Sequence, residues 1–205
     1  MPGPFMRRSM RHRASGTPGS TAFGGILLLA LLFSFPAPGP ADTETALWAA
    51  LKSGGHVALI RHALAPGTGD PPGFRLDDCS TQRNLSEAGR EHARSIGARF
   101  REHGIGNVVV YSSQWCRCLE TARLLDLGKV HPFPGLNSLF RDGSREAAQT
   151  ADVRALIRKP PKGTSLVLVT HRFNITALSG EIPQSGEIVV LRPDGENLTV
   201  MGRIR

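Results

Sequence analysis

The chain has 205 residues, of which 40% are apolar and 20% are charged. That length suits about one domain, and the composition is typical of a globular protein rather than of a disordered or collagen-like chain. The formal net charge is +8, but residues 1–41 contain four arginines and no acidic residue. Residues 42–205 hold 21 basic and 17 acidic side chains, a net charge of +4, with no Lys/Arg run that would favour a nucleic-acid partner.

The first 41 residues have the three parts of an export signal. Arginines from Arg7 to Arg13 supply positive charge, residues 23–35 are apolar, and Gly39-Pro40-Ala41 offers a small-x-small cleavage site. As a helix, the apolar stretch would cover about 20 Å, less than the ~30 Å hydrocarbon core of a bilayer. We therefore predict cleavage after Ala41, no stable membrane span after cleavage, and export to the periplasm or out of the cell. An uncleaved anchor is the alternative.

Helical and strand patterns then alternate along the chain. In order, the residues predict a helix over 43–52, a strand over 57–61, a loop over 65–80, a helix over 86–103, a strand over 107–111, helices over 115–127 and 146–157, a strand over 166–170, a helix over 174–178, and strands over 187–192 and 198–203. This alternation predicts a single domain over residues 42–205 with a three-layer α/β/α fold. Its central sheet should be mostly parallel, with an antiparallel C-terminal edge hairpin around Pro193-Asp194-Gly195.

Export would carry the three cysteines into a compartment where disulfides persist. Cys116 and Cys118 stand two apart at a predicted helix start, where their side chains diverge, so a bridge would join Cys79 to one of them. Buried, unpaired thiols are the alternative. The Cys-x-Cys spacing lacks a second ligand cluster, and we predict no metal site.

Arginine, histidine and serine residues follow three of the predicted strands. Arg61 and His62 end the first strand, Ser112-Ser113 lead on to Arg117, and His171 follows Thr170. In a parallel sheet, the carboxyl ends of the strands meet at one edge. Two guanidinium groups and two imidazoles could therefore meet in one pocket.

Such a set of side chains suits a phosphoryl group. Arginine binds phosphate through paired, charge-assisted hydrogen bonds. A neutral imidazole can attack phosphorus, and a second can donate hydrogen bonds to the transferring oxygens. This chemistry requires neither a metal ion nor a cofactor, and the sequence has no Walker loop, zinc-protease motif, calcium loop or serine-hydrolase elbow.

The chain resembles the histidine phosphatase superfamily, also called phosphoglycerate mutase-like. The resemblance is carried by Leu59-Ile60-Arg61-His62, by Asn84-Leu85-Ser86-Glu87-Ala88-Gly89, by residues 112–122, and by Val167-Leu168-Val169-Thr170-His171. It implies that His62 is the phosphorylated nucleophile, that Arg61 and Arg117 bind phosphate, and that His171 completes the pocket.

Three positions depart from the family pattern. Ala63 follows the nucleophile where glycine is usual, and Arg172 follows His171 where a small residue is common, adding positive charge near the mouth of the pocket. Asn137 stands where many members carry the glutamate that protonates the leaving group. Asn137 could still bind substrate, but another carboxylate must act as acid, or the leaving group needs little help. The candidate acids are Asp70, Asp77, Asp78, Asp142 and Glu146.

Arg83 lies in a polar stretch that either closes over the substrate or is an ordinary exposed loop. Together these features predict a metal-independent phosphoric monoester hydrolase that works through a phosphohistidine on His62. Its partner would be a phosphorylated small molecule, a cell-envelope phosphate or a phosphoprotein. The alternatives are a non-catalytic anion-binding module of the same fold and a phosphomutase.

Overall fold

The computed structural model describes residues 40–158 and 161–205. Its helices are α1 (Pro40–Ser53), α2 (Glu87–Glu102), α3 (Cys116–Leu124), α4 (Glu146–Ile157) and α5 (Arg172–Ser179), with short 3₁₀ turns at Cys79–Thr81, Pro134–Leu136 and Gly143–Arg145. The strands are β1 (Val57–Arg61), β2 (Val108–Ser112), β3 (Val130–Pro132), β4 (Ser165–Thr170), β5 (Ile188–Asp194) and β6 (Asn197–Ile204). The predicted leader lies outside these residues except for Pro40 and Ala41, which begin α1.

The six strands form one sheet in the order β3-β2-β4-β1-β5-β6. β1 to β4 run parallel to one another, β5 is antiparallel to β1, and β6 is antiparallel to β5. The predicted three-layer fold with a mostly parallel sheet and an antiparallel terminal hairpin is therefore confirmed.

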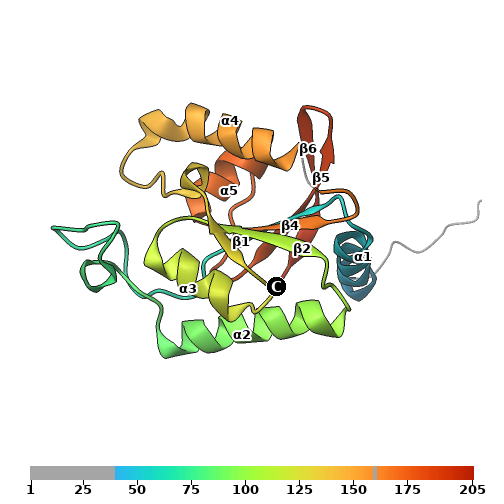
Figure 1. The fold of residues 1–205 in the computed structure, drawn as a ribbon, viewed down its shortest axis with the longest axis horizontal. Coiled ribbons are helices and arrows are strands. Elements are labelled where there is room, and N and C mark those ends of the chain that lie inside the picture. Colours follow the sequence, from blue (N-terminus) through green and yellow to red (C-terminus); the bar gives the residue numbers. More distant parts are fainter. Residues whose placement is uncertain (1–39, 159–160) are drawn as a thin grey trace, which may run out of the picture. The chain divides into compact units, whose positions relative to one another are not determined.

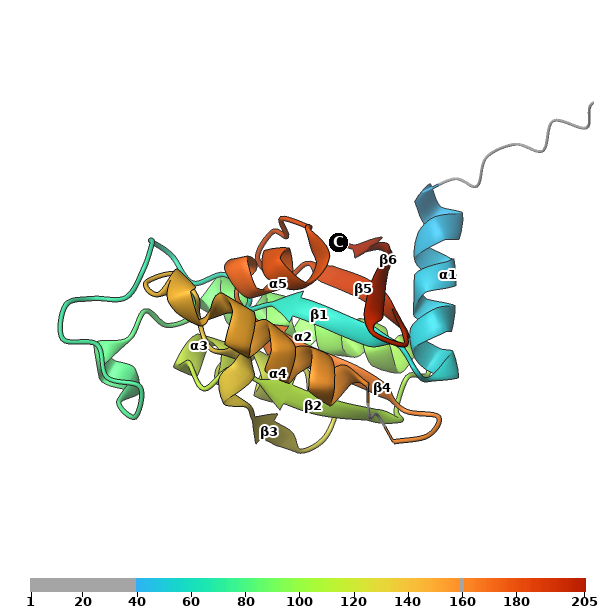
Figure 2. The ribbon, with the colours of Figure 1, turned by 90° about the horizontal axis from the view of Figure 1, so that it is seen from above.

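Helices cover both faces of this sheet, as Figures 1 and 2 show. Alternate residues of β1 point to opposite faces, as the strand period requires. Ala58 and Ile60 belong to the apolar cluster with α1, α2 and α3, whereas Val57 and Leu59 belong to the cluster with α4 and α5. Both clusters are almost fully buried, so the central strands are fixed in depth and register by the removal of apolar surface from water.

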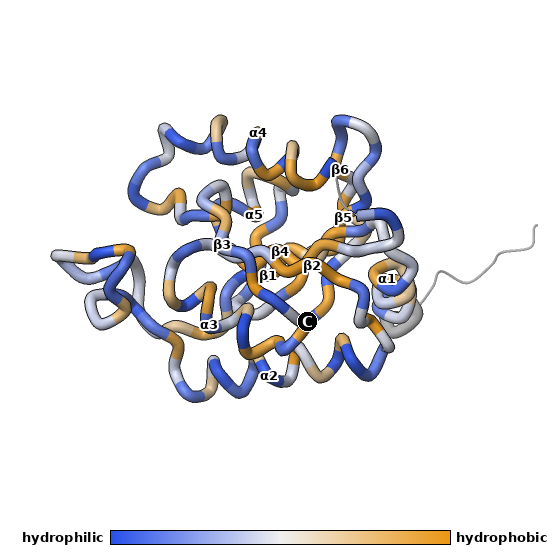
Figure 3. The backbone as a smooth tube through the Cα atoms, viewed as in Figure 1, coloured by the Kyte–Doolittle hydropathy of each residue, from blue (hydrophilic) through white to orange (hydrophobic). Residues whose placement is uncertain are grey.

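Hydrophobic residues concentrate along the central strands, and the helices alternate between hydrophilic and hydrophobic positions (Figure 3). This distribution explains why most elements could be predicted from the sequence. β3 was missed because its three residues, Val-His-Pro, give no apolar run. None of the helices within the described residues is long and apolar enough to span a membrane.

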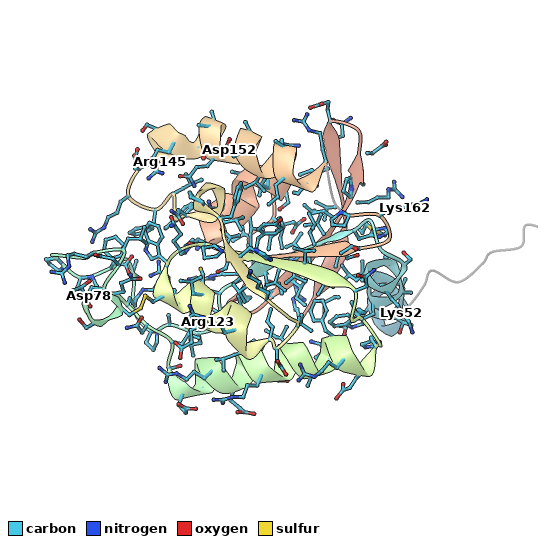
Figure 4. The ribbon with its side chains drawn as sticks, viewed as in Figure 1. Lys52, Asp78, Arg123, Arg145, Asp152 and Lys162 are labelled. Atoms are coloured by element: carbon cyan, nitrogen blue, oxygen red, sulfur yellow. A yellow bond between two sulfur atoms is a disulfide. The ribbon has the colours of Figure 1, made fainter. Side chains whose placement is uncertain are left out.

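A long segment joins β1 to α2 and projects from one end of the sheet in Figure 1. We call residues 63–85 the β1–α2 loop. A disulfide joins Cys79 of this loop to Cys116, the first residue of α3, and Figure 4 shows the bond. The predicted pairing of Cys79 with one of the other two cysteines is confirmed, and Cys118 is a buried free thiol. The bridge ties the loop to the helix that carries Arg117.

Candidate functional site

β1 and β4 lie side by side, and their ends bring two histidines together. Arg61 pairs in register with Thr170, and the backbone N–H of His62 donates to the carbonyl of Thr170 at 3.0 Å. The two strands thus deliver His62 and His171 at the same level of the sheet. Their ring centroids lie 5.5 Å apart, and both side chains are buried.

A cavity of about 180 Å³ opens at this edge of the sheet. Pockets that enclose whole drug-sized ligands are typically ~300–1,000 Å³, so this one suits one end of a larger molecule. The cavity is lined by Arg61, His62, Gly67, Thr68, Gly69, Asp70, Arg83, Arg117, Ser138, Phe140, His171, Arg172 and Phe173. The structure therefore brings together Arg61, His62, Arg117 and His171, as expected from the strand ends.

The imidazole of His62 has one nitrogen committed to the backbone. Nδ1 lies 2.8 Å from the carbonyl oxygen of Ala63, and because a carbonyl can only accept, Nδ1 must carry the proton. The lone pair of the neutral ring is then on Nε2. Burial, with a further contribution from the positive charges of nearby arginines, lowers the pKa of His62 to about 3. The ring is thus neutral near pH 7, as a nucleophile must be.

Two guanidinium groups in the cavity each have an N–H donor without a hydrogen-bond acceptor among the described residues. The Nε–H groups of Arg61 and Arg117 are buried and have no hydrogen-bond partner among the described residues. Arg61 uses Nη1 to bind the carbonyl of Pro183 at 3.0 Å. Buried donors without acceptors are costly. An oxyanion held by these two groups would satisfy them, which favours an anionic ligand.

His171 stands in a chain of hydrogen bonds that fixes its tautomer. Arg117 Nη2 lies 3.5 Å from Nδ1 of His171 and can only donate, so Nδ1 accepts and Nε2–H donates to Ser113 Oγ at 2.9 Å. Ser113 in turn donates to Oδ1 of Asn137 at 3.3 Å. Burial, together with the nearby His62 ring and the arginines, holds the pKa of His171 well below its usual value.

Asn137 itself does not line the cavity. Its side chain is 4% exposed and is held by the backbone N–H of Gln114, by the side chain of Gln114 and by Ser113. The expectation that Asn137 binds substrate is therefore corrected. Its amide is separated from the cavity by Ser113, and it contacts His171 only indirectly, through the hydrogen bonds of Ser113. The sequence alone does not show that Asn137 is buried.

The family model described as histidine phosphatase superfamily (branch 1) matches residues 57–139. That segment contains Arg61, His62 and Arg117, three of the cavity residues. Over this segment the chain is similar to the histidine phosphatase superfamily. No curated protein sequence matches the chain.

Solved structures of histidine phosphatase fold share the architecture at low sequence identity. The protein histidine phosphatase SixA complexed with tungstate is 18% identical over 73% of this chain and 96% of its own, with a TM-score of 0.54. Phosphoserine phosphatase from Entamoeba histolytica, in complex with 3-phosphoglyceric acid, is 16% identical over 73% of this chain and 96% of its own, with a TM-score of 0.55. A mycobacterial glucosyl-3-phosphoglycerate phosphatase complexed with VO3 is 16% identical over 71% of this chain and 96% of its own, with a TM-score of 0.50. These likenesses show that the chain shares their fold.

The β1–α2 loop contributes Arg83 to the lining of the cavity. Its Nε donates to the carbonyl of Gly69 at 2.7 Å, and Nη1 donates to the carbonyl of Ala65. Of the two interpretations of this stretch, the structure favours a loop that forms part of the pocket wall. Partial burial and the charge of Arg117 lower the pKa of Arg83. Arg172 lines the mouth at the start of α5 but is exposed.

Asp70 is the acidic side chain that lines the cavity, among the residues described. The other candidate acids lie elsewhere: Asp77 and Asp78 stand farther along the β1–α2 loop, where Figure 4 labels Asp78, and Asp142 and Glu146 are exposed near α4. No three His, Cys, Asp or Glu side chains cluster as metal ligands would within the described ranges.

Two phenylalanines at the mouth were not expected from the sequence. Phe140 and Phe173 are 47% and 46% exposed, and their ring centroids lie 5.9 Å apart. Both line the same cavity as the arginines and histidines described above. The position of Phe173, two residues after His171, is a signal in the sequence that places it near the site, whereas Phe140 stands in an irregular segment that gives no pattern.

Proposed function

We propose that this protein is a phosphatase that cleaves phosphoric monoesters through a phosphohistidine on His62. The observation that carries the proposal is the hydrogen bond from His62 Nδ1 to the carbonyl of Ala63, in a cavity lined by arginines. It leaves the nucleophilic lone pair on Nε2, beside groups that suit the three peripheral oxygens of a phosphoryl group.

In the first step, Nε2 of His62 forms a bond to phosphorus while the bond from phosphorus to the leaving oxygen breaks. Arg61 and Arg117 hold the peripheral oxygens and neutralise charge in the transition state. In the second step, water attacks phosphorus and the P–N bond breaks. Because Nδ1 keeps its proton on Ala63, the imidazole departs as a neutral ring.

The structural neighbours support phosphorylated substrates in general. SixA is described as a protein histidine phosphatase and the Entamoeba protein as a phosphoserine phosphatase. For this chain we propose a phosphorylated small molecule, a cell-envelope phosphate or a phosphoprotein as substrate. The predicted leader and the Cys79–Cys116 disulfide both favour an exported protein, so we propose that the substrate is met outside the cytoplasm.

Hydrolysis of p-nitrophenyl phosphate by the purified full chain in the presence of a chelator tests the proposal. We expect turnover in the wild type, an acid-labile phosphoenzyme after quenching, and loss of both in His62→Ala. His92→Ala, a histidine exposed on α2 outside the cavity, is the matched control and should retain full activity. Equal rates in the wild type and His62→Ala would refute the assignment of His62.

The same experiment separates the two alternatives. A non-catalytic binding module would bind phosphate in competition with phosphorylated ligands but form no phosphoenzyme. A phosphomutase would form the phosphoenzyme but return the phosphoryl group to an organic acceptor, so inorganic phosphate would not be released in step with the leaving group. Release of one phosphate for each nitrophenol supports the phosphatase.

A further inference from the structure

Asp70 occupies an unusual position for a carboxylate, because it lies within the anion-binding cavity. Its Oδ1 lies 2.7 Å from Nη1 of Arg117, and its Oδ2 lies 3.4 Å from Nη2 of the same residue. The indole N–H of Trp115 donates to Oδ2 at 3.1 Å, and the backbone N–H of Arg83 donates to Oδ1 at 3.2 Å. The side chains of Asp70 and Arg117 are only 9% and 3% exposed.

This ion pair uses the guanidinium that a phosphoryl group would need. A carboxylate that contacts both Nη atoms of one arginine makes the same two-point contact as a phosphate. A buried ion pair is in addition a poor source of stability, because desolvation offsets most of the attraction. The pair is therefore better explained by what happens when an anion enters the cavity.

We propose that Asp70 is the acid that protonates the leaving group, and that the substrate's phosphoryl group releases it from Arg117. This inference rests on the proposed function and names one more catalytic residue for it. In the free protein, Asp70 balances part of the charge of Arg117. When phosphate takes over that guanidinium, Asp70 is left beside the phosphoryl group and its leaving oxygen.

The environment of Asp70 changes in the direction that an acid requires. In the free protein, partial burial raises its pKa, but the hydrogen bond and charge of Arg117, with smaller contributions from Trp115 and Arg83, lower it below the ordinary value. A bound phosphate removes the largest of these stabilising contacts and adds negative charge nearby. Both changes raise the pKa of Asp70. Phosphate groups have a second pKa near 6, so a monoanionic substrate can bring the proton itself.

The protons balance over the two steps. In the first, the bond between phosphorus and oxygen breaks, Nε2 of His62 bonds to phosphorus, and the proton on Asp70 moves to the leaving oxygen to give a neutral alcohol. In the second, water adds to phosphorus and gives its proton to the Asp70 carboxylate, while the P–N bond breaks. The products are the alcohol and hydrogen phosphate, and both side chains return to their states at the start of catalysis.

Leaving-group dependence tests this role, because an acid matters most for poor leaving groups. The rate of phosphoenzyme formation is measured by rapid quench for p-nitrophenyl phosphate and for glycerol phosphate, in wild type and Asp70→Asn. We expect the variant to form the phosphoenzyme from glycerol phosphate roughly 10²–10⁴-fold more slowly. With p-nitrophenyl phosphate, its rate should stay within about tenfold of the wild type, because nitrophenolate leaves without a proton.

An equal loss with both substrates, or no loss with either, would overturn the proposal. An equal loss would mean that Asp70 only positions Arg117. Asp142→Asn, an exposed candidate acid outside the cavity, is the matched control and should match the wild type with both substrates. If Asp70→Asn fails to fold, Asp70→Glu keeps the carboxylate and should retain the glycerol phosphate reaction better than Asp70→Ala. A wild type that forms no phosphoenzyme at all would instead refute the proposed function.

Discussion

His62 and His171 follow strands whose central residues are completely buried, such as Ile60 and Val169. Asp70 and Arg83, on the opposite wall of the cavity, belong to the β1–α2 loop, where most residues are exposed or half-buried. The sheet wall is fixed by apolar packing and by the strand ladder. The loop wall is fixed by individual polar contacts, one disulfide and a small apolar cluster at its ends. The proposed nucleophile thus stands on the wall held by the sheet, and the carboxylate that we propose is displaced stands on the wall formed by the loop.

Polar contacts within the loop show how that wall is held. The side-chain amide of Gln82 donates to the carbonyls of Arg75 and Leu76, at 3.0 Å each. Its carbonyl accepts from the backbone N–H of Cys116 at 3.0 Å, next to the disulfide. At its other end the loop meets α2 at Gly89, where a Cβ would lie 2.2 Å from the carbonyl oxygen of Leu64. The loop is therefore anchored at its ends and at the disulfide.

The largest effect is expected at Arg117, which both walls share. Arg117→Met removes the guanidinium that binds Asp70 in the free protein and that, in the proposed mechanism, binds phosphate in the complex. By analogy with the loss of one transition-state donor, kcat/KM for p-nitrophenyl phosphate should fall roughly 10²–10³-fold or more. Arg123→Met, an exposed arginine on the same helix, should leave the rate unchanged. If Arg117→Met retained full activity, the cavity would not be the phosphate site.

The sheet wall could be predicted from the sequence, because short apolar runs ending in Arg61-His62 and Thr170-His171 give both the strands and their polar ends. Arg117 was also predicted, since its helix follows a strand. The depth of Asn137 and the pairing of Asp70 with Arg117 could not be predicted. Both depend on the path of irregular segments, where the chain has no periodicity and position is decided by single hydrogen bonds.

Removing the disulfide should loosen the loop wall more than the sheet wall. Cys79→Ser with Cys116→Ser releases a crosslink between residues 37 apart and should lower the free energy of unfolding by about 2–4 kcal/mol. The loop should also open locally, so the amides of Gln82 and Arg83 should lose more protection from hydrogen exchange than that of Leu168.

Leu168→Ala is the matched comparison on the sheet wall. It should cost about 2–5 kcal/mol, because Leu168 is fully buried, but it should not open the loop selectively. The two variants then have similar stabilities and different exchange patterns. Uniform loss of protection in both would mean that the loop is not an independent unit.

The pH dependence of stability tests whether His62, on the sheet wall, is buried away from solvent. His62 has a pKa of about 3 in the folded protein and about 6.5 when unfolded. Below pH 6.5 the unfolded chain gains a proton that the folded chain excludes, so stability falls as the pH falls toward 3. At pH 5 this amounts to about 2 kcal/mol, since each pH unit is worth about 1.4 kcal/mol.

His171 has a lowered pKa and therefore contributes a loss of the same sign. His62→Asn should remove only the part due to His62, which urea midpoints measured at pH 7 and pH 5 would show as a smaller decrease than in the wild type. Asp70 contributes little in this interval, because its lowered pKa acts below its ordinary value near 4. An unchanged pH dependence in His62→Asn would show that His62 accepts a proton in the folded protein at pH 5.

The smallest effect is expected at the mouth, where two aromatic rings are exposed. Phe173 stands at the start of α5, next to the end of β4, whereas the ring of Phe140, from the segment after the 3₁₀ turn Pro134–Leu136, lies beside Gly69 of the β1–α2 loop. If the rings contact the leaving group, Phe173→Ala should raise KM for p-nitrophenyl phosphate about fivefold, in line with ~1 kcal/mol for one aromatic contact. KM for acetyl phosphate, whose leaving group is small, should not change. Because the ring of Phe140 is held only against the irregular β1–α2 loop, Phe140→Ala should have the weaker effect, and Ile182→Ala, exposed outside the cavity, should have none. A larger effect from Phe140→Ala would show that the loop wall, rather than the sheet wall, selects the leaving group.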